Sequence, residues 1–361
     1  MAQVNRKQLL DCALCPNMCR CECPVVQAWG KEAVSPSGKS RLAHLLLEGR
    51  LSWSEEFLEA LSACVGCRGC QTLCPFPELD LAEELLAARQ EASQAGVCLH
   101  QVAPYLGNLK KFGSPYGQGR GLAPAGERGA AVLYFAGCTA AANNPQSVET
   151  ALALLEKAGV SYQTLDEFCC GYPAEIWGDL ELARQLAADN RERFAASGAR
   201  TLVTGCPECR WTFTRRYGAW GIELPLEVVD STTFFLGLIR EGRLQPRPVQ
   251  GIDTVTYHDP CLRARLEEDW ERPRELLGLI PGLTLVEAAS SKEKVRCCGG
   301  GQMAQLTFPA LAETMARRRL AELPAVSAAL TDCPFCRESL LVGGGTVMEL
   351  TELLGRACIE R

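Results

Sequence analysis

The chain has 361 residues, of which 47% are hydrophobic and 22% charged, and it contains 21 cysteines. A chain of this length can bury a core without disulfide staples, so the cysteines do not indicate a small secreted scaffold. The net charge of −6 does not favour nucleic acid, and no apolar run approaches the roughly 18 residues of a membrane span. Residues 1–11 also lack the apolar core of a signal peptide, so we expect a cytoplasmic protein whose clustered cysteines serve metal or redox chemistry.

Two cysteine runs occupy the N-terminal part of the chain. The second, with the spacing C-x2-C-x2-C-x3-C-P, is typical of a [4Fe-4S] ferredoxin, in which the fourth cysteine ligates another cluster. The first run has one extra residue between its second and third cysteines. Within it Cys21 competes with Cys23, and we choose Cys23 because a proline follows it. The predicted ligand sets are Cys12, Cys15, Cys19 and Cys74 for one cubane, and Cys64, Cys67, Cys70 and Cys23 for the other.

Helices are expected over 39–50 and 54–61, between the two runs, as a helical ferredoxin-like module requires. The stretch 107–129 is rich in Gly, Pro and charge and is predicted to be a loop. A shorter break at 245–251 separates the two halves of the remaining chain. We therefore expect four segments: a two-cluster domain over 1–106, a linker over 107–129, and two further domains over 130–246 and 247–361.

Those two domains are an internal repeat of a single Cys, then Cys-Cys-Gly, then Cys-Pro-x-Cys, with similar gaps in both copies. The first copy holds Cys138, Cys169, Cys170, Cys206 and Cys209, and the second holds Cys261, Cys297, Cys298, Cys333 and Cys336. Strands are predicted over 130–135, 160–165 and 201–204 with helices over 146–158 and 179–197, and strands again over 254–257, 283–287 and 328–331. This alternation predicts a Rossmann-like α/β domain with a parallel sheet in each copy, and hence an α+β multidomain protein overall. Each cysteine follows a strand, so we expect five thiols to converge at one sheet edge in each domain.

Adjacent cysteines point in different directions, which suits a multi-iron cluster better than one tetrahedral ion. Gly171 and Gly299 are expected to clear space where the backbone passes a cluster. Each Cys-Pro-x-Cys places Pro at the first helical position, where the helix dipole favours thiolate. Two structural zinc sites, or inert buried cysteines, are the alternatives for this repeat, and structural zinc is the alternative for the ferredoxin runs.

The repeated pattern resembles the CCG cysteine-rich domain of heterodisulfide reductases. The whole chain resembles a ferredoxin-like subunit fused to two such domains. This layout occurs in D-type heterodisulfide reductase subunits and in iron–sulfur subunits of glycolate oxidase, lactate-utilisation and anaerobic glycerol-3-phosphate dehydrogenase systems. The resemblance implies that each complete five-cysteine set can hold a non-cubane [4Fe-4S] cluster, and that such clusters can cleave a disulfide in one-electron steps.

A few residues outside the cysteine sets also carry expectations. His258 precedes Cys261 and is a candidate to bond a cluster sulfur or donate a proton, or else it stabilises a turn. The arginines at 317–319 are predicted to form a solvated face, and Cys98 and Cys358 to be ordinary thiols. The second repeat is our choice for the substrate side, because three glycines at 299–301 would leave open space and Phe335 offers apolar cover where the first repeat has Glu208.

The leading hypothesis is an oxidoreductase subunit of the heterodisulfide-reductase type, with two cubanes and one or two further clusters. The alternative is an electron relay that couples a flavin-dependent hydroxy-acid or glycerol-3-phosphate dehydrogenase to quinone, and the third possibility is a zinc-stabilised scaffold. No dinucleotide motif follows a strand, so a flavoprotein, or a haem or quinone-reactive membrane subunit, is expected as partner. Through such a partner the chain would associate with a membrane.

Overall fold

The N-terminal part of the chain is built from α-helices and short 3-10 turns. The computed structural model describes residues 5–76, 78–117 and 124–359. The helices of this module are α1 (Arg6–Leu14), α2 (Pro24–Trp29), α3 (Pro36–Leu47), α4 (Glu55–Ser62), α5 (Leu81–Gln94) and α6 (Ala103–Phe112). The two expected helices are present as α3 and α4, and each begins after a serine whose hydroxyl accepts a backbone N–H, Ser35 from Gly38 and Ser54 from Phe57. The cysteine runs cross the 3-10 turns η1 (Met18–Glu22) and η3 (Gly69–Leu73).

The prediction of a loop over 107–129 is wrong for residues 107–112. Helix α6 continues to Phe112 and ends at Gly113, whose φ of 66° is left-handed. Residues 118–123 of this expectation lie outside the described chain. Further on, Gly126 pairs with Gln163 at the edge of the first sheet, so the segment after the gap is attached to the repeat that comes next in the chain.

Each repeat contains a parallel four-stranded sheet. The first sheet has the order β2-β1-β3-β4 and the second β6-β5-β7-β8. The strands are β1 (Val132–Phe135), β2 (Tyr162–Gln163), β3 (Thr201–Thr204), β4 (Glu227–Asp230), β5 (Thr254–Tyr257), β6 (Thr284–Leu285), β7 (Ala328–Thr331) and β8 (Val347–Glu349). The edge strands β4 and β8 were not expected from the sequence. They are short, and β4 is only partly buried, so neither shows a long buried apolar run.

Helices cover the sheets and connect their strands, as parallel pairing requires. In the first repeat they are α7 (Cys138–Asn143), α8 (Pro145–Lys157), α9 (Tyr172–Ile176), α10 (Leu180–Ser197), α11 (Pro207–Trp211), α12 (Tyr217–Ala219) and α13 (Ser231–Arg240). In the second they are α14 (Cys261–Leu266), α15 (Glu271–Gly278), α16 (Ala304–Thr307), α17 (Pro309–Leu320), α18 (Pro334–Val342) and α19 (Leu350–Cys358). Both Cys-Pro-x-Cys motifs open a helix with proline in its first turn, as predicted.

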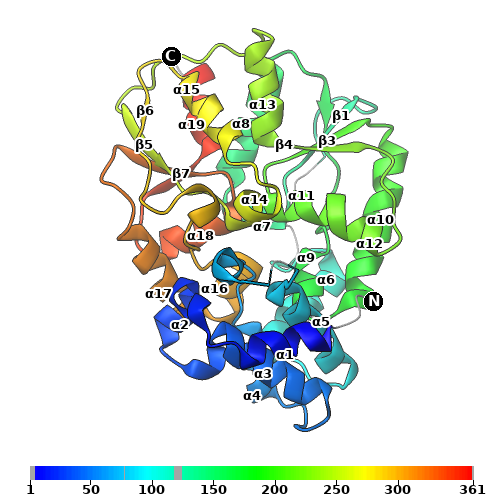
Figure 1. Cartoon of the computed structure of the whole chain (residues 1–361). Coiled ribbons are helices and arrows are strands. Elements are labelled where there is room, and N and C mark those ends of the chain that lie inside the picture. Colours follow the sequence, from blue (N-terminus) through cyan, green and yellow to red (C-terminus); the bar gives the residue numbers. More distant parts are fainter. Residues whose placement is uncertain (1–4, 77, 118–123, 360–361) are drawn as a thin grey trace.

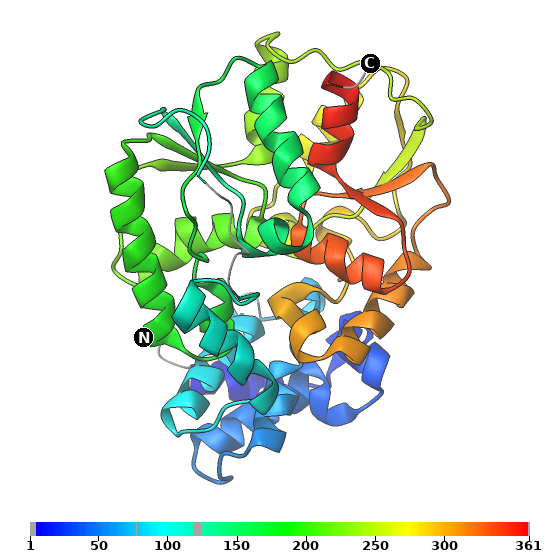
Figure 2. The same cartoon turned by 180° about the vertical axis from the view of Figure 1, so that it is seen from behind.

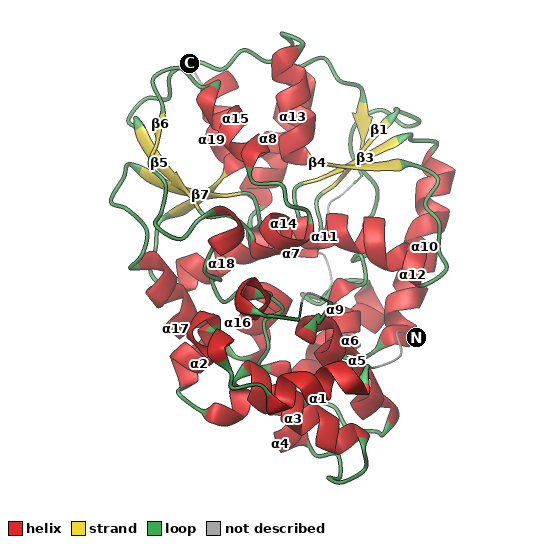
Figure 3. Cartoon of the chain, viewed as in Figure 1, coloured by secondary structure: helices red, strands yellow, loops and turns green. Residues whose placement is uncertain are grey.

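The two sheets lie side by side, with α8, α13, α15 and α19 between them (Figure 1). Figure 2 shows from behind that the C-terminal helix α19 lies against α8, which belongs to the other repeat. The helical module lies below both sheets, and the short helices α7, α11, α14 and α18 form the layer between it and the strands (Figure 3). These four helices begin at or just after motif cysteines, so the layer carries thiols from both repeats. None of the helices in the described chain is long and apolar enough to cross a bilayer.

Candidate metal centres

The thiols of Cys12, Cys15, Cys19 and Cys74, which we call the outer set, lie together at the surface of the helical module. Burial raises the pKa of Cys12 to about 11 and that of Cys19 to about 12, and in both cases the charges of Cys15 and Cys74 add to the rise. The four residues line a hollow of about 400 Å³. Its rim carries three strongly exposed apolar side chains, those of Leu14, Met18 and Leu73. The outer set is therefore open to a partner molecule.

The thiols of Cys23, Cys64, Cys67 and Cys70, which we call the inner set, lie deeper. Burial raises the pKa of Cys70 well above its ordinary value, and the charges of the other three members contribute to that rise. Cys23 is 7% exposed, whereas Cys21 is exposed and its Sγ lies 3.5 Å from the carbonyl oxygen of Met18. The structure thus brings Cys23, and not Cys21, to the second cysteine run.

Five thiols converge in the first repeat. The Sγ atoms of Cys138 and Cys169 lie 3.6 Å apart. Cys170 hydrogen-bonds with both Cys169 and Cys209, and Cys209 also bonds with Cys206. The Cys-Cys pair therefore directs one thiol toward the start of α7 and the other toward the start of α11.

The second repeat has the same arrangement. Cys297 bonds with Cys261 and Cys298, Cys298 with Cys336, and Cys336 with Cys333. All five sit past the ends of β5, β6 and β7, as the five of the first repeat do for β1, β2 and β3. We call the two groups the first-repeat set and the second-repeat set.

The four sets are arranged in series. The charge of Cys19, in the outer set, acts on Cys70 of the inner set. The inner set meets the second-repeat set where Cys67 and Cys297 hydrogen-bond, a contact that lowers the pKa of Cys67 to about 6. The second-repeat set meets the first-repeat set through the carboxyl group of Glu208.

Glu208 lies between the two repeats. Its Oε2 lies 3.4 Å from Cys206 Sγ and 3.3 Å from Cys333 Sγ. The side chain is buried, and burial raises its pKa to about 7. The sequence comparison of Glu208 with Phe335 treats Glu208 only as a charged residue of the first repeat. No local pattern indicates that its carboxyl group contacts cysteines of both repeats.

The donor atoms fit iron–sulfur clusters. Each set in the helical module offers four thiols and each repeat offers five. Closely packed sulfur donors are the ligands that iron–sulfur clusters require, and five exceed the four of a structural zinc ion. The residues present are therefore compatible with [4Fe-4S] clusters at all four positions.

The reason given for Gly171 and Gly299 is wrong. Both have positive φ, and a Cβ on Gly171 would meet the backbone of Ala183 in α10, while one on Gly299 would meet Met315 in α17. They allow a tight turn against a helix. Gly137 does lie against a thiol, since a Cβ there would be 3.1 Å from Cys209 Sγ.

The open space expected at the three glycines of the second repeat is also absent from the described structure. A Cβ on Gly300 would lie 2.4 Å from the carbonyl oxygen of Phe335, and one on Gly301 would lie 2.3 Å from that of Val65. The glycines let the second repeat pack closely on the helical module. A small cavity lies beside motif cysteines of the first repeat, and its lining includes Gly137, Cys138 and Tyr172 together with Phe335 of the second repeat.

The expectation that helix N-termini favour thiolate does not hold for the first cysteine of either Cys-Pro-x-Cys. Burial raises the pKa of Cys206 to about 12 and that of Cys333 well above its ordinary value. The cost of burying a charge exceeds what one short helix dipole returns. A bound cluster would supply the positive charge that stabilises these thiolates.

His258 lies at the second-repeat set. One ring nitrogen of His258 and the Sγ atoms of Cys298 and Cys336 all lie within 4.8 Å of one another. Arg319 Nε donates to His258 Nδ1 over 3.1 Å, so Nδ1 is the acceptor and Nε2 is left to bond with Cys298. The solvated face predicted for the three consecutive arginines is accordingly wrong at Arg319, which is 1% exposed.

Two supporting residues were missed in the sequence. Glu167 accepts hydrogen bonds from the backbone N–H groups of Ala136 (2.7 Å) and Gly137 (3.0 Å), just before Cys138. Asn190 in α10 donates to the carbonyl oxygen of Cys169 over 3.0 Å. Both hold loops that carry thiols, but neither belongs to a motif with a recognisable spacing.

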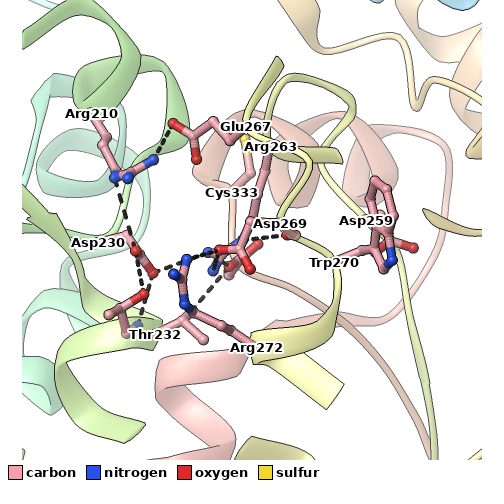
Figure 4. Close-up of polar contacts among 12 residues, drawn as sticks. Arg210, Asp230, Thr232, Asp259, Arg263, Glu267, Asp269, Trp270, Arg272 and Cys333 are labelled. Carbon is pink, nitrogen blue, oxygen red and sulfur yellow. Dashed lines mark hydrogen bonds and ion pairs between the residues drawn. The ribbon is translucent and has the colours of Figure 1, made fainter. Parts of the chain in front are cut away.

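A buried ion-pair network joins the two repeats (Figure 4). Arg263 Nη1 lies 2.5 Å from Asp332 in its own repeat and 3.2 Å from Asp230 in the other. Thr232 donates to Asp332 over 3.1 Å, and Arg210 pairs with Glu267 across the same boundary. Because Asp332 precedes Cys333 in the chain, this network lies next to the second-repeat set.

Comparison with known proteins gives a consistent picture. Residues 132–214 and 255–340 match the family model described as "Cysteine-rich domain", and residues 8–77 match "4Fe-4S dicluster domain". The D subunit of the dihydromethanophenazine:CoB–CoM heterodisulfide reductase of Methanosarcina mazei is 31% identical over 311 residues, which span 80% of this chain and 74% of that protein. The B subunit of the fumarate reductase (CoM/CoB) of Methanothermobacter marburgensis is 29% identical (83% of this chain, 62% of that protein), and the EtfAB:quinone oxidoreductase of Syntrophomonas wolfei is 27% identical (77% and 42%).

Proposed function

The chain belongs to the family of heterodisulfide reductase D subunits and related iron–sulfur oxidoreductases, and on that premise we propose that its four thiol sets form one electron-transfer series that ends at the first-repeat set. As a member of this family it is an iron–sulfur electron-transfer oxidoreductase subunit with several [4Fe-4S] clusters. We assign one cubane to the outer set, one to the inner set, and one non-cubane cluster to each repeat. Bound there, the clusters supply one-electron transfer.

The contact between Cys67 and Cys297 is the observation that carries the proposal. It joins the helical module to the second repeat at the level of the ligand atoms themselves. Glu208 then connects the second-repeat set to the first-repeat set. The outer set, with its exposed apolar rim, is the end that a partner can reach.

We expect the substrate to bind at the first-repeat set, the last set of the series. This replaces the choice of the second repeat that was made from the sequence. The second-repeat set is enclosed, because Gly301 packs on Val65 and Cys297 on the inner set. The first-repeat set borders a cavity of about 10 Å³, the room of one water molecule, lined by Cys138, Tyr172 and Phe335. A disulfide is the substrate class that the complete cysteine sets favour, in agreement with the name of the heterodisulfide reductase relatives. We expect the partner to be a flavoprotein, or a haem or quinone-reactive membrane subunit.

The test begins with metal content and then turns to activity. Anaerobically purified chain should contain about sixteen irons if all four sites hold [4Fe-4S] clusters, and little zinc. With a reduced viologen as donor, it should reduce a small disulfide, Cys170→Ser should abolish that turnover, and Cys98→Ser, which changes an exposed cysteine outside the sets, should not.

Stoichiometric zinc would contradict the proposal. Iron-loaded protein that reduces no disulfide but passes electrons from a flavoprotein to quinone would establish the relay alternative instead. If Cys298→Ser loses turnover while Cys170→Ser stays active, the substrate site lies at the second-repeat set.

A further inference from the structure

Lys39 in α3 is a lysine buried among cysteines. Its side chain is only 2% exposed. Its charge acts on Cys23, Cys64, Cys70 and Cys67. These four residues are the inner set, so the ammonium group is positioned against that set as a whole.

Lys39 also lacks the partner that a buried cation ordinarily has. Among the residues that the structure describes, the lysines within 4.0 Å of a carboxylate oxygen are Lys110 and Lys292. Arg68, which is similarly buried in the same module, is paired with both Asp80 and Glu83. A buried charge without a counter-charge is strongly unfavourable, so the position of Lys39 points to an anion supplied by the thiol set and what it binds.

The effect of Lys39 distinguishes the two sets of the helical module. On Cys12 of the outer set its charge is the weakest of the acting groups, and burial, the hydrogen bond from Ser40 and the charges of Cys15 and Cys74 are all larger. The inner set is further surrounded by positive side chains that bond its backbone. Arg89 Nη2 donates to the carbonyl oxygen of Cys64 over 3.1 Å, and Arg265 Nη1 from the second repeat donates to that of Cys67 over 2.7 Å.

We propose that Lys39 is the counter-charge of the inner set and raises the reduction potential of the cluster bound there. This inference rests on the proposed function, which assigns a [4Fe-4S] cluster to these four cysteines. Reduction adds one negative charge to a buried site, and a fixed positive charge nearby favours the reduced form. Net charge around the cluster is among the factors that set its potential. Lys39 is thus a residue that adjusts electron transfer between the helical module and the repeats.

The test measures potentials and not turnover. Lys39→Met removes the charge with little change in side-chain volume, Lys39→Arg keeps it, and Lys31→Met makes the same replacement at an exposed lysine of the module. The midpoint potentials of the iron-loaded full chain are followed by electron paramagnetic resonance during redox titration. In Lys39→Met the equilibrium constant for reduction of one cubane should fall at least tenfold. For a one-electron couple this lowers the midpoint potential by about 59 mV. Lys39→Arg should retain most of the original potential, and Lys31→Met should show no shift.

The inference would be overturned if iron-loaded Lys39→Met had the same potentials as wild type. If the methionine variant does not load iron, Lys39→Gln takes its place in this test. A shift in Lys39→Arg as large as in Lys39→Met would also overturn it, because packing and not charge would then be responsible. Loss of one cluster in Lys39→Met with retention in Lys39→Arg would support it. Wild-type protein that holds zinc in place of iron would remove both this inference and the proposed function, whereas unchanged potentials in iron-loaded protein would remove this inference alone.

Discussion

Cys21 and Cys23 are two residues apart, yet only Cys23 is buried beside the second cysteine run. Cys23 is the residue before α2, with its thiol buried near Cys64 and Cys67, while Cys21 is exposed within η1. The proline after Cys23 was the sequence signal for this choice. It starts α2 and thereby directs the preceding residue inward.

Replacing Cys23 by Ser should remove the inner cluster. We expect the iron content to fall by about four per chain, with loss of one cubane signal, because a hydroxyl is a poor substitute for a thiolate. The matched variant Cys21→Ser should keep both the iron and the spectrum. Iron analysis with electron paramagnetic resonance measures both, and the opposite pattern would assign the ligand to Cys21.

Glu349 shows at the same scale how burial changes a carboxyl group. Its oxygens accept hydrogen bonds from Asn144 (2.8 Å) and Ser147 (2.7 Å) of the other repeat, and burial raises its pKa to about 7. The unfolded chain therefore loses this proton at lower pH than the folded chain does. Glu349 lowers the stability of the fold progressively between about pH 4.5 and pH 7, and by a constant amount above that range.

Glu349→Gln should remove this dependence. Between pH 4.5 and pH 8 the free energy of unfolding of the variant should gain about 3 kcal/mol relative to wild type, from 1.36 kcal/mol per pKa unit. Urea unfolding at the two pH values measures the difference. Glu149→Gln, at an exposed position of α8, is the control, and its free energy of unfolding should change with pH as that of wild type does. The same pH dependence in Glu349→Gln would refute the prediction.

Among the secondary-structure elements, the turn from Cys298 into η7 (Gly301–Met303) shows how a short segment connects two domains. Its glycines were expected to create space, but they allow contact, since Gly301 faces the backbone of Val65. The same turn carries Gln302, which contacts Arg89 and lies against Gly66. The helical module and the second repeat thus meet at a segment that also holds a cysteine pair.

Gly301→Ala should weaken this contact. A Cβ placed 2.3 Å from a carbonyl oxygen forces the backbones apart, and we expect a loss of about 1–3 kcal/mol in the free energy of unfolding. Gly237→Ala in α13 is the matched control, because its Cβ would meet nothing within 4 Å. That control should be stabilised by up to about 1 kcal/mol through helix propensity. Equal urea midpoints for the two variants would show that the close approach has no energetic consequence.

On the scale of the whole molecule, the two repeats form one body through buried charges. Arg263 is 4% exposed in its side chain and lies between Asp332 and Asp230. This pairing crosses the boundary that the sequence placed near residue 246 (Figure 4). It lies next to Cys333, whose Sγ contacts Glu208 of the first repeat.

Arg263→Met should leave Asp230 and Asp332 buried without their shared cation. Removal of one member of a buried pair costs about 3–5 kcal/mol, so we expect a loss of that size in the free energy of unfolding. Arg317→Met breaks an exposed i,i+4 pair with Glu313 and should cost about 0.5 kcal/mol or less. If both variants unfold at the same urea concentration, the network does not hold the repeats together.

The sequence by itself determined the thiol sets, the duplication and most of the central strands. These features depend on local spacing. The intervals between cysteines, the proline after Cys23 and the apolar runs of β1, β3, β5 and β7 can be seen in short windows. The edge strands β4 and β8 were missed for the same reason, since their windows carry too little apolar pattern.

Only the tertiary structure decided which set lies next to which and what surrounds each one. Three of these contacts link residues that are far apart in the chain: Cys67 with Cys297, Glu208 with Cys333, and Arg319 with His258. The burial of Lys39 likewise depends on the domain interior into which its side chain is turned. Such contacts arise from the packing of whole domains, and a charged residue in a polar helical pattern gives no local sign that its side chain is buried. Spacing therefore predicted which cysteines lie together, whereas packing decided the order of the sets and their electrostatic surroundings.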